Sequence, residues 1–148
     1  STPIKSSAAS DVYKRQVSDL HKRNIPVITH LILGLPGETK EDMLSSVRYV
    51  GSLPVTGIKL QLLHILKGTD LGTAYMADPF PLFTLEEYCD LIADCIALLP
   101  PEIVIHRLTG DGPRNLLLAP LWSTDKKRVL NTIQKYLRER DLWQGKNI

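Results

Sequence analysis

The segment from His30 to Thr39 (HLILGLPGET) places the strongest constraint on how this 148-residue chain can fold. An apolar run stops at a Gly-Leu-Pro-Gly turn, and the turn leads directly into a helix pattern. Thr39 suits the N-cap of that helix, and Asp42 three residues later can bond back to it in a capping box. The order strand, tight turn, helix predicts an α/β protein, in which ligands bind outside the carboxyl ends of the strands.

Strand and helix patterns alternate along the rest of the chain. Strand patterns cover residues 25–33, 58–64 and 102–108, and helix patterns cover residues 11–24, 39–53, 84–99 and 124–141. The order α-β-α-β-α-β-α predicts α/β units with a parallel sheet and right-handed crossovers. Because three strands cannot close a barrel, the chain is either a small open α/β domain or the last part of a larger barrel.

Local patterns refine this prediction. The first strand is almost continuously apolar, which is typical of a parallel strand covered on both faces. In the second strand Ile58, Leu60 and Leu62 share one face. Ser123 or Thr124 is the expected N-cap of the last helix. The irregular connection over residues 65–83 is long enough to predict a functional role.

Composition excludes several classes of protein. The formal net charge of +2 is too small to indicate nucleic-acid binding by itself. No apolar run approaches the ~20 residues that span a bilayer, so no membrane association is expected. Cys89 and Cys95 predict no disulfide framework, and with the four histidines they show no metal-ligand spacing. We therefore expect a cytoplasmic protein with two reduced, buried cysteines and no metal site of its own.

Polar side chains gather near the predicted carboxyl ends of the strands. The substrate-side candidates are His30, Gln61, His64, His106, Arg107 and Arg114. If the strands are neighbours in sequence order, several of these side chains converge on one rim, which favours a binding site. The alternative is a polar network that only fills the interior of a barrel. The turn Thr109–Pro113, flanked by two arginines, suits either an anionic ligand or a plain reversal of the chain.

Two further interpretations stay open. The helix that starts after Gly34–Thr39 could bind a nucleotide or phosphate in a small stand-alone α/β module without catalysis. The basic residues between Lys126 and Arg140 suit salt-dependent RNA binding, although a solvated helix face explains the same charges.

The segments taken in order resemble one enzyme family. HLILGLPGET followed by KEDM resembles the fifth strand and loop of radical S-adenosylmethionine (SAM) enzymes, including oxygen-independent coproporphyrinogen oxidase and the elongator-like branch. GIKLQLLHILKGTDL, FTLEEY, HRLTGDGPR and the terminal DLWQGK continue the likeness. Together they resemble the C-terminal part of radical SAM proteins of the YhcC/YtqA type, over about Val17 to Lys146.

This resemblance implies a partial (β/α)6 TIM-like barrel, with a [4Fe-4S] cluster and SAM in the full-length parent. Ile32 and Gly34 match positions that contact the adenine, and His30 stands where the family pattern has its first glycine. The loop after the sixth strand also approaches the adenosine, and here it comprises Leu66, Lys67, Gly68 and Thr69. The resemblance further implies that the parent modifies tRNA.

The expected domain organisation follows from this likeness. Residues 1–16 are expected to be a disordered or non-native leader, and residues 17–148 the C-terminal half of the barrel with its terminal helix. The three-cysteine cluster motif of the family belongs near the first strand, and Cys89 and Cys95 cannot replace it. The chain is therefore expected to need the missing N-terminal half of the barrel and to be inactive alone.

Overall fold

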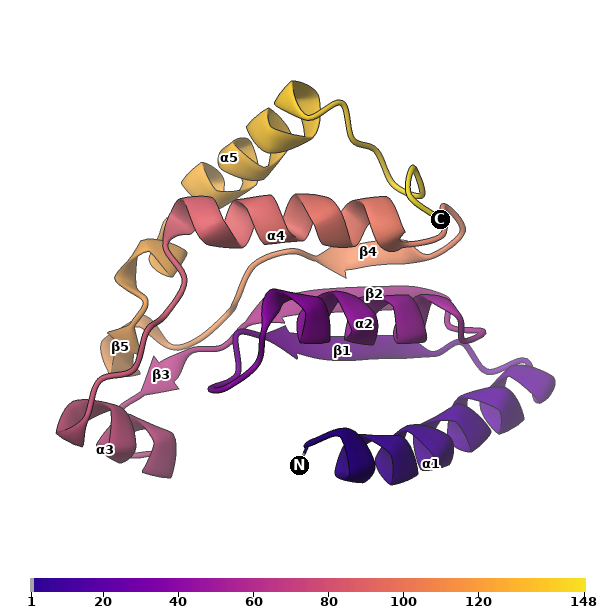
Figure 1. The fold of residues 1–148 in the computed structure, drawn as a ribbon, viewed down its shortest axis with the longest axis horizontal. Helices are drawn as coiled ribbons and strands as arrows, with labels where there is room; N and C mark the ends of the chain where they lie inside the picture. The colour runs from indigo at the N-terminus through magenta and orange to yellow at the C-terminus, as the bar shows by residue number, and fades with distance from the viewer. Residues whose placement is uncertain (1) are drawn as a thin grey trace.

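A computed structural model describes the backbone of residues 2–148 and the side chains of residues 11–148 (Figure 1). The helices are α1 (Thr2–Lys22), α2 (Lys40–Gly51), α3 (Asp70–Ala77), α4 (Leu85–Leu98) and α5 (Lys126–Glu139). The strands are β1 (Ile28–Leu33), β2 (Gly57–Leu62), β3 (Ile65–Leu66), β4 (Val104–Arg107) and β5 (Leu117–Ala119). Two short 3-10 helices are η1 (Arg114–Leu116) and η2 (Leu121–Thr124).

The main sheet has three parallel strands in the order β1-β2-β4, which confirms the predicted parallel α/β arrangement. Helices α2 and α4 lie over the same face of this sheet, and α5 packs on α4 (Figure 1). Between β2 and β4 the register shifts by one residue, so that Ile58 is opposite Ile105 but Lys59 is opposite Arg107.

The core lies between the sheet and these helices. Ile58, Leu60 and Leu62 all point into it, as the alternation in the second strand predicts. Helix α4 contributes nine buried residues to this core and packs against both α2 and α5. Its two cysteines are buried and free, which confirms the expectation of core thiols.

The opposite face of the sheet is open. Ile28 and Ile32 on β1 are 42% and 44% exposed, and Val104 on β4 is 57% exposed. The prediction that both faces of the first strand are covered is therefore wrong for this chain. Every second residue of β1 from Ile28 to Ile32 is solvent-exposed, and two of these three are apolar, because α2 and α4 cover only the other side. We call the side that carries these residues the open face.

Of the two predicted helix N-caps, the structure confirms the first and contradicts the second. Thr39 and Asp42 form the predicted capping box, with the Asp42 N–H donating to Thr39 and the Thr39 N–H donating to Asp42. The predicted cap of the last helix is wrong, because Asp125 caps α5. The Ser123 and Thr124 hydroxyls donate instead to the backbone carbonyls of Pro120 and Leu121, at the start of η2.

The long connection after β2 has structure of its own. Strand β3 pairs antiparallel with β5, a strand that comes after β4 in the chain. Helix α3 begins shortly after β3. Thr69 caps α3 by accepting from the Gly72 N–H, and its hydroxyl donates to the Leu66 carbonyl. This small second sheet lies beyond the carboxyl ends of β1 and β2 (Figure 1).

Helix α1 covers the predicted N-terminal helix and extends it to Thr2. Ser1 and the side chains of residues 1–10, which belong to the expected leader, lie outside the described residues. The non-native origin of residues 1–16 stays a prediction. Across the part of the chain that the structure describes, no helix has both the length and the apolar character needed to cross a bilayer.

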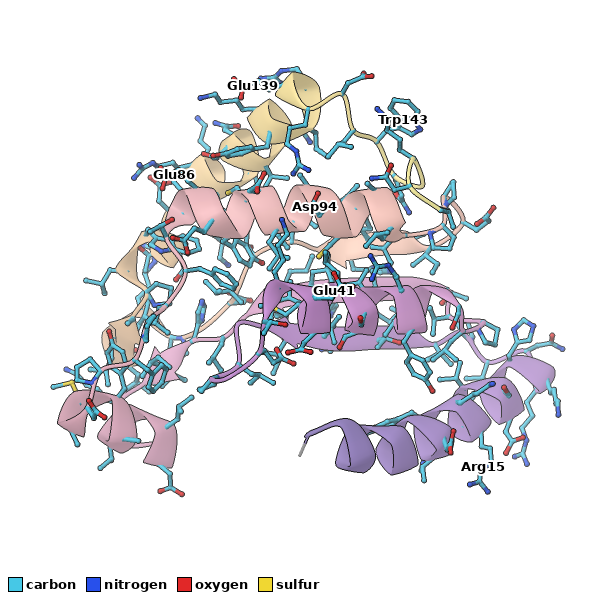
Figure 2. All side chains as sticks on the ribbon, viewed as in Figure 1. Arg15, Glu41, Glu86, Asp94, Glu139 and Trp143 are labelled. Atoms are coloured by element: carbon cyan, nitrogen blue, oxygen red, sulfur yellow. The ribbon has the colours of Figure 1, made fainter. Side chains whose placement is uncertain are left out.

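An ion-pair network joins the three covering helices. Asp94 on α4 accepts from Lys40 at 2.7 Å and from Arg140 at 2.5 Å, and Arg140 also binds Asp90 at 2.8 Å. Figure 2 labels Asp94 on α4, which lies between α2 and α5 in this view. Burial raises the pKa of Asp94, but the hydrogen bonds from Lys40 and Arg140 outweigh it and lower that pKa below its ordinary value.

We expect Asp94→Asn to lower the free energy of unfolding by about 1–2 kcal/mol at neutral pH. A carboxylate whose pKa is depressed in the folded state stabilises above its ordinary pKa, and this stability is lost as the pH falls through the folded-state value. The difference between wild type and variant should therefore shrink on acidification, measured by urea unfolding between pH 7 and pH 3. Glu102→Gln, an exposed carboxylate, is the control, and an equal pH dependence in both variants would contradict the assignment.

Candidate functional site

The open face carries several of the predicted site residues side by side. In the β1–β2 register His30 is opposite Lys59, and Ile32 is opposite Gln61. His106 joins them from β4, since a Cβ on Gly57 would lie 2.5 Å from the His106 ring. His30, Gln61 and His106 therefore share one surface with Ile32 and with the charged Lys59. The prediction that these polar groups converge is supported for these three histidine and glutamine side chains.

His64 lies in a cradle made by the turn that follows β4. A Cβ on Gly112 would lie 2.5 Å from His64 Nδ1, and a Cβ on Gly110 would overlap the Nε2 side of the ring. The Nε2 atom is buried and has no hydrogen-bond partner among the described residues. Burial lowers the pKa of His64, nearby Asp111 raises it, and Lys126 lowers it again. The ring is therefore held neutral near pH 7, with one nitrogen able to accept a proton or hydrogen bond.

Asp111 connects this cradle to two cations. It pairs with Lys126 at 2.6 Å and with Arg107 at 3.4 Å. The hydrogen bond from Lys126, followed by the charges of Lys126 and Arg107, lowers the pKa of Asp111. Arg114 lies in η1 and donates to the Thr124 carbonyl at 2.9 Å. Arg107 and His64 are thus brought together, while Arg114 is placed on the α5 side of the turn.

Gly34 is constrained by its protein neighbours. Its φ is +88°, a conformation that favours glycine, and a Cβ there would lie 3.1 Å from the Phe83 ring. Its N–H lies 3.3 Å from the Met43 sulfur, so this donor is already occupied. The turn therefore needs glycine for structural reasons, whereas the neighbouring Ile32 presents its side chain on the open face.

The predicted adenosine loop lies in a different element. Leu66 belongs to β3, Thr69 caps α3, and Gly68 between them has a φ of +77° with open space around its Cα. Lys67 pairs through its backbone N–H with the Leu116 carbonyl at 2.8 Å. This loop extends the rim beyond the strand ends (Figure 1). A role for it in cofactor binding stays a prediction.

Glu38 is a candidate that the sequence analysis missed. Its Oε2 atom is buried and has no hydrogen-bond partner within the described part of the chain. Burial is the main cause that raises the pKa of Glu38, and repulsion from Asp42 adds to it, while a backbone hydrogen bond from Leu35 opposes it. Its position directly after the Gly-Leu-Pro-Gly turn, at a strand end, was the signal that could have found it.

The start of α2 is poorly suited to bind a phosphate. The Asp42 N–H is taken by the Thr39 hydroxyl, and Glu41 and Asp42 place two carboxylates in the first turn. Negative charge there repels an anionic ligand and already satisfies the helix dipole. These bonds count against the stand-alone phosphate module, in which this helix start would hold the ligand.

The described residues do not fit an iron–sulfur cluster. Burial raises the pKa of Cys89 to about 11 and that of Cys95 to about 12, so both thiols stay protonated in the core. Cluster ligands are thiolates. No three His, Cys, Asp or Glu side chains in the described part of the chain are grouped to hold a metal ion.

Comparison with known proteins gives a consistent picture. Residues 55–139 match the model of the radical SAM C-terminal domain. The uncharacterized protein YtqA of Bacillus subtilis is 40% identical over 134 residues, which are 90% of this chain and 42% of YtqA. Protein YhcC of Escherichia coli is 35% identical over 127 residues, or 86% of this chain and 41% of YhcC. The chain thus spans about two fifths of the length of these relatives.

A solved structure shares the fold. The archaeal Methanocaldococcus infernus Elp3 with an N-terminal deletion (1–46) superposes with a TM-score of 0.68 at 18% identity. The match covers 84% of this chain and 29% of the Elp3 chain. At this level of identity the likeness concerns the arrangement of helices and strands.

Proposed function

The chain belongs to the radical SAM C-terminal domain family, and from this premise we propose that it forms one wall of the SAM pocket and of the substrate rim in a radical SAM enzyme. The observation that carries the proposal is the open face. The sheet exposes Ile28, Ile32 and Val104 on one side. Such an exposed apolar surface is typical of a face that packs against further protein or a ligand. In the proposal, further strands of a partial (β/α)6 barrel enclose this face.

Within this wall Ile32 is the residue proposed to contact the adenine. Its exposed side chain offers apolar area, and Gln61 beside it on the neighbouring strand offers an amide donor and acceptor. An apolar surface with a few placed polar groups is the usual character of a small-molecule pocket. Gly34 shapes the turn behind this position, and Leu66, Lys67, Gly68 and Thr69 are proposed to approach the adenosine from the rim.

The [4Fe-4S] cluster is assigned in this proposal to the N-terminal half of the parent barrel. Since Cys89 and Cys95 do not fit it, no catalytic step can be assigned to residues of this chain through the cluster. The chain contributes the shape of the pocket and the polar groups at its edge. His64 and Arg107, which lie together at the carboxyl end of the sheet, are proposed to face the substrate, and a tRNA is the proposed substrate of the parent.

The proposal is tested by SAM binding to the full-length protein. We expect titration calorimetry to show binding, and hydrogen exchange with SAM present to show slower exchange in β1 and in the turn after it. Helix α5, on the far side of α4, serves as the internal reference and should exchange at an unchanged rate. SAM binding that protects neither β1 nor β2 would refute the assignment of this wall.

We further expect the 148-residue chain expressed alone to bind a hydrophobic dye and to associate with itself. The open face carries exposed Ile28, Ile32 and Val104, and β1 and β4 are unpaired sheet edges. Dye fluorescence and light scattering measure the effect, with the full-length protein as the control. A monodisperse chain that binds no dye and melts cooperatively would show that the open face needs no cover.

A further inference from the structure

The outer side of α5 carries an excess of positive charge. Residues 125–140 contain six Lys and Arg against two acidic residues, whereas the whole chain has 18 against 16. The charge of this chain is therefore unevenly placed, and the rest of it is slightly acidic. Val129 and Ile133 on the inner side of the helix are buried, which fixes the orientation of α5 and keeps the basic side turned to solvent.

Several of these cations are free to meet a ligand. Within the described residues Lys127, Arg128 and Arg138 make no ion pair, and Lys135 has only a weak contact of 3.9 Å with Glu139. By contrast Arg140, on the inner side, is fully used by Asp90 and Asp94. On a helix face that served only for solubility, acidic residues four positions from the basic ones would stabilise the helix. This face has one such pair, Lys135 with Glu139.

The surface along these cations is hollowed in two places. One hollow is lined by Lys127, Arg128, Lys135 and Arg138, by the polar side chains of Asn131 and Thr132, and by Asp125, the N-cap of the helix. The second is lined by Arg114, Thr124, Asp125, Lys126 and Lys127 and continues the first towards the start of the helix. We call this continuous surface, from Arg114 to Arg138, the α5 track.

The α5 track reaches the proposed substrate rim. Asp111 pairs with Lys126 at the start of α5 and with Arg107 at the end of β4, beside His64. Cations therefore extend from the rim to the far end of α5, where Figure 2 labels Glu139, and they outnumber Asp111 and Asp125, the two carboxylates among them. A row of cations interspersed with amide and hydroxyl groups suits a chain of phosphates more than a single anion.

We propose that the α5 track binds the phosphodiester backbone of an RNA whose modified nucleotide lies at the rim near His64 and Arg107. This inference rests on the proposed function for the position of the rim. The contacts are to phosphates, so they fix the position of the RNA and leave its sequence to be read elsewhere. Arg is suited to this role because its guanidinium can bind phosphate with two parallel hydrogen bonds.

The test compares two pairs of charge reversals in the full-length protein. Lys127→Glu with Arg138→Glu changes the α5 track, and Lys22→Glu with Arg23→Glu makes the same change in charge at two exposed positions where α1 ends. Binding of fluorescein-labelled bulk tRNA is followed by anisotropy as a function of salt. We expect the α5 pair to raise the Kd by about tenfold or more and to reduce the slope of log K against log salt by about 2. The α1 pair should leave both values close to wild type.

A charge-conserving pair, Lys127→Arg with Arg138→Lys, guards against misfolding and should keep tRNA binding within about twofold of wild type. Equal Kd and salt slope for the α5 pair and the α1 pair would overturn the inference. Displacement of tRNA by polyglutamate at equal charge concentration would also overturn it, because it would assign the α5 track to an acidic protein. SAM titration of the same samples separates the two proposals. Loss of tRNA binding by the α5 pair in a protein that never binds SAM would leave the α5 track standing and refute the SAM pocket.

Discussion

Ile32→Asp is expected to weaken SAM binding by the full-length protein by about 30-fold to 1000-fold, equivalent to about 2–4 kcal/mol. The change removes the apolar side chain proposed to lie against the adenine and places an anion in a pocket that would close over it. In the 148-residue chain alone the change should cost about 1 kcal/mol of folding free energy at most, because Ile32 is 44% exposed there on the open face. Titration calorimetry measures the affinity.

Ile28→Asp is the matched control for this prediction. Ile28 is 42% exposed on the same strand and the same face, but it lies at the amino end of β1, away from the rim. It should leave the SAM affinity within about twofold of wild type, since a generic effect of charge on the open face would act on both variants alike. An equal loss of SAM affinity in the two variants would refute the contact between Ile32 and the adenine. It would leave intact the proposal that the open face is a buried wall of the barrel.

Gly110→Ala is expected to lower the free energy of unfolding by about 1–3 kcal/mol, because the new methyl group occupies the space of the His64 ring. The ring has little room to retreat, since Gly112 closes its other side. The β4–η1 turn must therefore move, and with it Asp111 and its two ion pairs. Urea unfolding of the full-length protein gives the effect on stability.

A double-mutant cycle tests the cause of this effect. In a His64→Ala background the clash is gone, so Gly110→Ala should cost about 1 kcal/mol less than it does in the wild type. Gly37→Ala is a useful contrast, because its φ of +83° strains alanine but no neighbouring atom lies within 4 Å. A cost of Gly110→Ala that is the same with and without the imidazole would show that the turn, and not the cradle, requires glycine.

The features that could be predicted from the sequence are local or periodic. The Thr39–Asp42 capping box depends on two residues three positions apart, and the burial of Ile58, Leu60 and Leu62 follows from alternation along one strand. The order of strands in the parallel sheet follows from short connections through helices. The membership of the radical SAM family rested on motifs that recur in order along the chain.

The features that were missed depend on residues far apart in the sequence. The pairing of β3 with β5 joins segments separated by about fifty residues, and neither strand is long enough to show a pattern. The cradle of His64 arises only when the turn after β4 folds over the end of β2. The exposure of β1 was also mispredicted, because an apolar strand has the same sequence whether its second face is covered by its own chain or by another segment.

The one-residue register shift between β2 and β4 decides which chemistry reaches the rim. With a continuous register, Arg107 would stand opposite Leu60, whose side chain is fully buried, and a guanidinium would be directed into the apolar core. The extra residue instead places Arg107 opposite Lys59, so that the guanidinium is kept out of the core. The length of this strand is therefore as much a determinant of the site as the identity of its residues.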